Sequence, residues 1–194
     1  MLLAIIPARS GSKGIPDKNI KLFCGKPLMH WTIKAALNAN GIDRVIVSTD
    51  DKRYATIAES SGAEVPFIRP KDLAQDNSSS ISTILHALKK LPQADEVLLL
   101  QPTSPLRNSK DIELFISFWR SKPNKAAISI SETKFHPSLI FDLKKDSTIK
   151  SLSNEVKVSR RQDLPKVFSI NGALYIANRD FLFKEKSFLS KNTL

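Results

Sequence analysis

The sequence has a single cysteine and three histidines, and these small numbers limit the chemistry that it can support. Cys24 has no second cysteine with which to form a disulfide, which favours a reducing, cytoplasmic compartment. His30, His86 and His136 are dispersed along the chain and lack the spacing of metal ligands. We therefore expect no disulfide framework, no histidine-based metal site and no catalytic histidine.

Long apolar segments and the standard phosphate-binding motifs are also missing. The apolar run at residues 1–7 is too short to span a bilayer, and it lacks the basic start and the cleavage site of a signal peptide. We interpret this run as a buried strand and expect no membrane partner. The glycine-containing loop that follows it matches neither GxxxxGK[ST] nor GxGxxG, so it is neither a Walker A loop nor a Rossmann fingerprint.

What the sequence has in excess is positive charge. Lys and Arg number 30 against 19 Asp and Glu, a formal charge of +11, and hydrophobic residues make up 41% of the chain. The composition is that of a folded globular protein, and the charge favours an anionic partner such as a nucleotide, an acidic sugar, a nucleic acid or a membrane surface. The basic residues are scattered rather than gathered in a stripe with aromatic residues, which argues against a nucleic-acid partner.

Short β-rich runs alternate with amphipathic helical runs through the first two thirds of the chain. We predict strands at 2–7, 44–49, 64–68, 96–100 and 126–131, and helices at 28–40, 51–61, 79–91 and 109–121. Continuous apolar strands separated by helices predict a parallel sheet buried on both faces, in an α/β fold. The polar segment 135–161 is expected to form an inserted arm of a single domain, before a last strand at 173–177 and a short helix from Asn178.

Polar loops follow the predicted strands, where open parallel sheets bind their ligands. The first loop, PARSGSKGIPDKN at residues 7–19, contains Arg9, Lys13 and Lys18 beside two glycines. Glycines allow a close approach of the backbone and cations neutralise charge, so this loop suits a triphosphate, with a solvated basic turn as the alternative. Two further loops contribute Arg69, a run of serines at a helix start, and the segment QPTSPLR, whose polar side chains from Gln101 to Arg107 are expected to add donors to the cleft.

The sequence is compatible with more than one role for two other loops. Residues 48–50 end a strand with small polar groups and a carboxylate, which fits a contact to a base, a ribose or a metal, or a cap of the next helix by Thr49 or Asp50. Residues 159–173 contain the pair Arg160–Arg161, which suits either a carboxylate ligand or the surface. The dipeptide Asn171–Gly172 predicts a turn that enters the last strand.

Taken together, five ordered segments resemble the acylneuraminate cytidylyltransferases, also called CMP-sialic acid synthetases. The segments are IIPARSGSKGIPDKN, VIVSTD, IRPKDLAQDNSSSIS, LLLQPTSPLR and SRRQDLPKVFSINGALY. The resemblance implies a Rossmann-like, three-layer nucleotidyltransferase fold and a homodimer in which the arm of one subunit reaches the sugar site of the other. It also implies transfer of CMP from CTP to a nine-carbon acidic sugar (sialic, legionaminic or pseudaminic acid), with release of pyrophosphate and with Mg²⁺ as cofactor.

The resemblance further implies roles for individual residues. Arg69 and Ser80 are similar to residues that hold the cytidine. Gln101, Arg161 and Asn171 are similar to residues of the sugar site. The implied triphosphate-binding set, whose three cations are the candidate catalytic residues, is Arg9, Ser12, Lys13, Lys18 and Asn19. No general base is identified among the residues.

One departure from the family pattern concerns the metal. Family members carry an acidic DIDTxxD-like segment after the last strand, whereas this chain reaches Leu194 without one, so the metal ligands are unknown and we expect an incomplete C-terminus. Three alternatives stay open: a cytidylyltransferase for the eight-carbon sugar Kdo, a non-catalytic domain that binds nucleotide or sugar, and a basic nucleic-acid binder. The pair Lys18–Asn19 and the QPTSPLR loop favour the nine-carbon branch over Kdo.

Overall fold

The computed structural model describes residues 1–133, 135–152 and 160–194, which divide into two units. The larger unit comprises Met1–Ser129 and Gly172–Leu194, and the smaller unit comprises Ile130–Asn171. Two strands, β6 (Ala126–Glu132) and β9 (Phe168–Asn178), contribute residues to both units. No helix within these described ranges is long and apolar enough to cross a membrane.

A five-stranded sheet of order β4-β1-β5-β9-β6 forms the centre of the larger unit. β1 (Leu2–Pro7) pairs in parallel with β4 (Arg44–Ser48) on one side and with β5 (Glu96–Leu99) on the other. β9 runs antiparallel to β5. Because the chain goes from β1 to β4 and then crosses back to β5, the strand order reverses between β1 and β5, and such a reversal is where open α/β sheets bind ligands.

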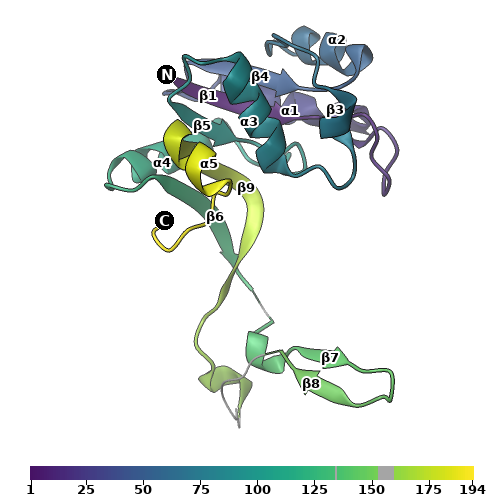
Figure 1. The fold of residues 1–194 in the computed structure, drawn as a ribbon, viewed down its shortest axis with the longest axis vertical. Helices are drawn as coiled ribbons and strands as arrows, with labels where there is room; N and C mark the ends of the chain where they lie inside the picture. The colour runs from purple at the N-terminus through teal and green to yellow at the C-terminus, as the bar shows by residue number, and fades with distance from the viewer. Residues whose placement is uncertain (134, 153–159) are drawn as a thin grey trace. The chain divides into compact units, whose positions relative to one another are not determined.

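Helices cover both faces of this sheet, so the larger unit has the predicted three layers (Figure 1). Side chains of β1 alternate between the faces, because Leu2 and Ala4 join one buried cluster while Leu3 and Ile5 join the other. This double burial explains why the strand is apolar throughout. The first cluster includes side chains of α1 (Leu28–Leu37), α2 (Lys52–Ser60) and α4 (Ser109–Arg120), and the second those of α3 (Ser80–Lys90) and α5 (Arg179–Glu185).

Two predicted elements differ in the structure. Residues 64–68, expected to be a strand, make only two isolated parallel bridges, since Pro66 in their middle has no backbone N–H to donate. The pair Asn171–Gly172, expected to turn, lies inside β9, which begins at Phe168. Gly172 has a φ of +77°, so the glycine bends the strand locally rather than ending it.

Short elements complete the larger unit and position the loop after β1. They are the 3-10 helices η1 (Lys18–Ile20) and η2 (Lys71–Ala74) and the two-stranded pair β2 (Leu22–Phe23) and β3 (Lys26–Pro27). Cys24 and Gly25 connect β2 to β3 with positive φ values of 48° and 76°, as a tight hairpin turn requires. Cys24 is exposed at this turn.

The smaller unit contains the hairpin of β7 (Phe141–Leu143) and β8 (Ile149–Ser151), together with η3 (Pro137–Leu139) and η4 (Arg161–Asp163). The Asp146 carboxylate closes the hairpin turn by accepting hydrogen bonds from the backbone and hydroxyl of Thr148, at 3.1 and 2.6 Å. Of the arm expected at 135–161, residues 153–159 lie outside the described residues.

Candidate functional site

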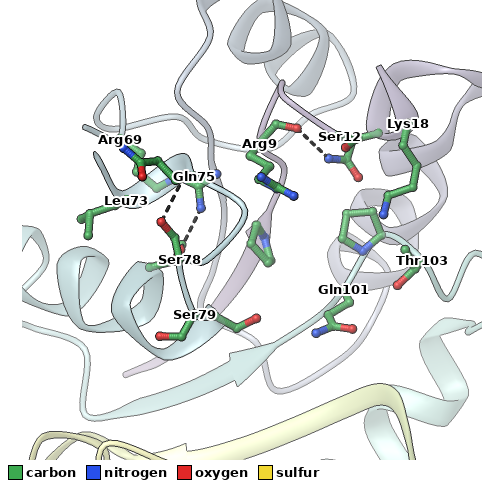
Figure 2. Close-up of a pocket in the computed structure, with 15 residues that line it drawn as sticks. Arg9, Ser12, Lys18, Arg69, Leu73, Gln75, Ser78, Ser79, Gln101 and Thr103 are labelled. Atoms are coloured by element: carbon green, nitrogen blue, oxygen red, sulfur yellow. Dashed lines mark hydrogen bonds between the residues drawn. The ribbon is translucent and has the colours of Figure 1, made fainter. Parts of the chain in front are cut away.

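A cavity of about 280 Å³ lies at the carboxyl ends of β1 and β5, where the strand order reverses. Its walls come from the loop after β1, the segment from Arg69 to the start of α3, and the turn after β5. Figure 2 shows Arg9, Lys18, Ser79 and Gln101 approaching the same space from these segments. The predicted site residues that line the cavity are Arg9, Ser12, Lys18, Asn19, Arg69, Ser80 and Gln101.

Three predicted residues lie elsewhere. Lys13 lines a neighbouring cavity of about 530 Å³ together with Arg9. Asn171 belongs to the smaller unit, where its side-chain amide donates to the Ser131 hydroxyl at 3.0 Å. Arg161 lies in η4 of the same unit, and its side chain is outside what the structure describes.

The sequence reasoning missed two polar residues of the cavity wall, Gln75 and Thr83. Thr83 follows Ser79 by about one helical turn, so helical spacing from the serine run was a usable signal for it. Gln75 had no such signal, because it lies in an irregular segment between η2 and α3.

The carboxylate of Asp50 anchors the loop after β1. It accepts hydrogen bonds from the backbone N–H of Ser10 at 3.0 Å and from the Ser10 hydroxyl at 2.8 Å. The predicted cap at Thr49 or Asp50 is wrong by one or two residues, because Asp51 caps α2 by accepting from the Arg53 N–H at 2.7 Å. The segment after β4 therefore serves the site by holding the loop after β1 in place.

The far end of the same loop is fixed by polar contacts. The hydroxyl of buried Tyr54 lies 3.0 Å from Oδ1 of Asp17, and Arg53 donates to Oδ2 at 2.8 Å. The Arg53 and Tyr54 hydrogen bonds lower the pKa of Asp17, which keeps that carboxylate charged. Asn19 is buried and donates to the Arg9 carbonyl at 3.0 Å, so it holds the loop backbone next to the cavity.

Arg69 is the most unusual side chain of the cavity. Its side chain is 3% exposed, its Nη1 donates to the Thr83 hydroxyl at 2.8 Å, and its Nη2 lies 3.8 Å from the Asp50 carboxylate. Among the residues that the structure describes, Nε and Nη2 have no hydrogen-bond partner. Burial lowers the pKa of Arg69, and a buried cation with unused donors is costly unless a ligand completes its contacts.

The serines at the start of α3 have different roles. Ser79 is the N-cap and accepts from the Ser82 N–H at 3.1 Å. Ser78 accepts from the Gln75 N–H at 3.1 Å and donates to the Asp72 carbonyl at 3.0 Å, which shapes the preceding loop. Capping explains one serine, and all of Ser78, Ser79 and Ser80 line the cavity beside a helix N-terminus that favours anions.

The turn after β5 presents Gln101 to the cavity and buries Arg107 in the core. Arg107 donates to the Ala173 carbonyl and, at 3.0 Å, to the Thr32 hydroxyl, so the expectation that it adds a donor to the cleft is wrong. Burial lowers the pKa of Arg107 to about 10. Gly172 approaches Gln101 so closely that a Cβ atom there would lie 3.1 Å from the Gln101 Oε1.

Positive charge dominates the cavity. Arg9, Lys18 and Arg69 line it, and none of its lining residues is an Asp or Glu. In the described parts of the chain no group of three His, Cys, Asp or Glu side chains is close enough together to hold a metal ion. These walls can neutralise a polyanion, but they supply no carboxylate ligand for Mg²⁺, which prefers oxygen donors.

A cationic cavity at the reversal point of a three-layer α/β sheet is typical of nucleotide-binding α/β proteins. Residues 3–193 match the family model described as Cytidylyltransferase. The chain is 39% identical to the CMP-N,N'-diacetyllegionaminic acid synthase of Legionella pneumophila, over 99% of this chain and 84% of that protein. It is 37% identical to an N-acylneuraminate cytidylyltransferase of Streptococcus agalactiae, over 98% of this chain but 46% of that protein. The chain therefore belongs to the cytidylyltransferase family of nucleotidyltransferases.

Solved structures agree on the fold. A CMP:2-keto-3-deoxy-manno-octonic acid synthetase complexed with CTP superposes with a TM-score of 0.74, covering 98% of this chain and 79% of that one. The two sequences are 22% identical, so this likeness concerns the fold alone. It confirms the predicted Rossmann-like nucleotidyltransferase architecture.

Proposed function

We propose that this protein transfers CMP from CTP to the anomeric hydroxyl of a nine-carbon acidic sugar and releases pyrophosphate. The observation that carries the proposal is the cationic cavity at the sheet reversal, lined by Arg9, Lys18 and Arg69 without a carboxylate. Family membership and the names of the relatives, which act on legionaminic acid and acylneuraminate, support the choice of CTP and of the sugar class.

The residues of the chain would act by positioning and by neutralising charge. In the transfer, the sugar hydroxyl attacks the α-phosphorus of CTP and loses its proton to water. The bond to the bridging oxygen of the β-phosphate breaks, and pyrophosphate leaves with the electron pair. Arg9, Lys13 and Lys18 would bind the β- and γ-phosphates and stabilise the charge that develops on the leaving group. Arg69 and Ser80 would hold the cytidine, and Gln101, Arg161 and Asn171 the sugar.

A matched pair of lysines tests the proposal. Lys18 lines the cavity, whereas Lys21, three residues later, is exposed and is not part of its wall. We expect Lys18→Met to lower pyrophosphate release from CTP plus sugar by about 100-fold, the usual effect of losing one charge-stabilising donor, while Lys21→Met stays near wild type. Absence of turnover with sialic, legionaminic and pseudaminic acids would overturn the proposed reaction.

The same sugar panel separates the nine-carbon branch from Kdo. Identity is 39% and 37% to proteins named for nine-carbon sugars and 22% to the octonic acid synthetase. We expect turnover with a nine-carbon acid and little with Kdo. Preference for Kdo would move the chain to the eight-carbon branch.

A non-catalytic domain is the second candidate function, and one observation favours it. No carboxylate lines the cavity, so its walls alone provide no acidic metal ligand. This candidate predicts that CTP binds, as measured by calorimetry, without Mg²⁺-dependent release of pyrophosphate.

Dependence on Mg²⁺ is part of the proposal. Nucleotidyl transfer uses divalent cations to neutralise phosphate charge, and substrate phosphates commonly complete the coordination of Mg²⁺. Treatment with EDTA should abolish pyrophosphate release, and added Mg²⁺ should restore it. Full activity in EDTA would contradict this part.

We also propose that the smaller unit mediates formation of a homodimer, with the arm at 135–161 near the partner's sugar site. Large apolar side chains of this unit face solvent, among them Phe135, Leu143 (70% exposed) and Ile149. Exposed apolar groups in such number are typical of an interaction surface. Leu143→Glu should convert a dimer to a monomer in light-scattering measurements, whereas Lys145→Glu on the adjacent turn should not.

A cytoplasmic location completes the proposal. The chain has one cysteine, Cys24, and it is a free, exposed thiol, which suits a reducing compartment. Cell fractionation with an antibody against the protein tests the location.

A further inference from the structure

Asp76 lies between two of the cations that we assign to the triphosphate. Its Oδ1 is 2.7 Å from Nη2 of Arg9, and its Oδ2 is 2.6 Å from Nζ of Lys13. Arg9 also donates through Nη1 to the Ala74 carbonyl at 3.2 Å. These contacts join the loop after β1 to the segment between η2 and α3.

A carboxylate between two cations offers them the same kind of contact as a phosphate group. Both groups accept charge-assisted hydrogen bonds through paired oxygens. Hydrogen bonds from Lys13 and Arg9 lower the pKa of Asp76, which keeps the carboxylate charged at neutral pH. Arg9 lines both the 280 Å³ cavity and the neighbouring 530 Å³ cavity that contains Asp76, so the ion pairs lie directly beside the candidate nucleotide site.

The two cations differ in their freedom to change partners. The Lys13 side chain is 84% exposed, so a rotation of its own torsions can move its ammonium group from Asp76 to another anion. Arg9 is less exposed and is also held by Ala74 and, through its carbonyl, by Asn19. Arg9 is therefore less free to move than Lys13.

We propose that Asp76 is a positioning residue that substitutes for phosphate in the unliganded protein and yields Arg9 and Lys13 to the pyrophosphate part of the nucleotide. The inference rests on the proposed function, because it takes CTP as the ligand of this cavity. On binding, the two ion pairs with Asp76 break and contacts to phosphate oxygens form. After transfer, Asp76 recovers both cations and competes with the product, so it weakens pyrophosphate binding and speeds pyrophosphate release.

The test is calorimetric binding of inorganic pyrophosphate at one fixed, low salt concentration. Asp76→Asn keeps the shape of the side chain and removes its charge. We expect this variant to bind pyrophosphate about three- to tenfold more tightly, the range set by losing one or two partly exposed ion pairs, with a slower dissociation rate. Asp76→Glu keeps the charge and should restore an affinity near that of wild type.

Asp72→Asn is the matched control. Asp72 is an exposed carboxylate on η2 in the same segment, and within the described residues it has no ion pair with Arg9 or Lys13. The control makes the same change of net charge, so a gain as large as that of Asp76→Asn would show a general charge effect and overturn the inference. Unchanged or weaker binding by Asp76→Asn would also overturn it.

A second measurement tests the exchange of partners without relying on Asp76→Asn alone. Lys13→Met removes one of the two cations that Asp76 holds. Adding Asp76→Asn to Lys13→Met should therefore change pyrophosphate affinity by less than Asp76→Asn changes it in the wild-type background. Independent effects of the two substitutions would contradict the exchange of partners. Pyrophosphate binding needs no sugar, so the two proposals can fail separately. If the wild-type protein turns over and Asp76→Asn has unchanged pyrophosphate affinity, only this inference is overturned. If Asp76→Asn binds pyrophosphate more tightly but the wild-type protein shows no turnover, only the proposed reaction is overturned.

Discussion

Replacing Arg69 by methionine should stabilise the unliganded protein and remove much of its response to CTP. The Arg69 side chain is 3% exposed and makes one side-chain hydrogen bond, to Thr83 at 2.8 Å. Its Nε and Nη2 have no hydrogen-bond partner in the described ranges. Methionine is unbranched and adaptable, so it can occupy the space of the Arg69 side chain without a charge or a hydrogen-bond donor.

The magnitude follows from three opposing contributions. The unused buried donors of Arg69 cost about 1–3 kcal/mol in the wild-type protein, and methionine removes that cost. Against this, the variant loses the bond to Thr83, worth about 1 kcal/mol, and the attraction to Asp50 at 3.8 Å. Asp50 keeps both of its bonds to Ser10, so its carboxylate remains satisfied. We expect a net gain of about 1 kcal/mol, which raises Tm by about 2–4 °C for a chain of this size.

Thermal unfolding with and without CTP measures both effects. At a concentration of about 100 times its Kd, CTP should stabilise the wild-type protein by about 2.7 kcal/mol, and Arg69→Met should lose most of that shift. The control is Arg120→Met, since Arg120 is a partly exposed arginine of α4 that pairs with Glu96 at 3.2 Å. It should change stability by less than about 0.5 kcal/mol and keep the CTP shift. A lower Tm for Arg69→Met with an intact CTP shift would refute the reasoning.

Three further predictions concern Gly172 beside Gln101, the buried Arg107, and the histidines His30 and His86. Gly172→Ala places a Cβ 3.1 Å from Oε1 of Gln101 at a φ of +77°, so we expect a stability loss of about 1 kcal/mol in urea titrations and a raised KM for the sugar with a smaller change for CTP. Arg107→Ala removes the buried guanidinium that binds a β9 carbonyl and an α1 hydroxyl, and should lower the free energy of unfolding by about 3 kcal/mol without a direct effect on CTP affinity. Burial and nearby cations lower the pKa of both His30 and His86 below 6.5, so the unfolded state takes up protons first as the pH falls. Stability should therefore be full above about pH 6.5 and decline below it, and the double variant His30→Gln/His86→Gln should flatten that decline in pH-dependent denaturation.

The core of this fold is readable from the sequence because burial leaves a local pattern. β1 is apolar throughout since both of its faces are covered, and α3 shows apolar residues at helical spacing since one side packs on the sheet. The place of residues 7–19 in the cavity wall could also be predicted, because glycines and cations directly after a buried strand are typical of phosphate-binding loops.

Partners far apart in the sequence could not be predicted. Arg69 and Arg107 both lie in loops that follow a predicted strand, yet one faces the cavity and the other is buried in the core. What separates them is the presence of acceptors for Arg107 on Thr32 and Ala173, which are 75 and 66 residues away from it. A local pattern holds no information about such acceptors, so both arginines look alike before the fold is known.

The carboxylates near the cavity divide into two kinds, and the division bears on how the site functions. Asp50 is largely buried, holds Ser10 through two hydrogen bonds and lies next to Arg69, so it maintains the shape of the site whether or not a ligand is present. Asp76 is exposed and pairs with the cations that a triphosphate would need, so it stabilises the unliganded state alone. A site that keeps Arg69 short of hydrogen bonds and occupies Arg9 with an internal anion is less stable and binds less tightly than it could. The unused donors of Arg69 favour binding of the nucleotide, whereas the internal anion at Arg9 favours release of pyrophosphate, and an enzyme that must release its product gains turnover from the second effect.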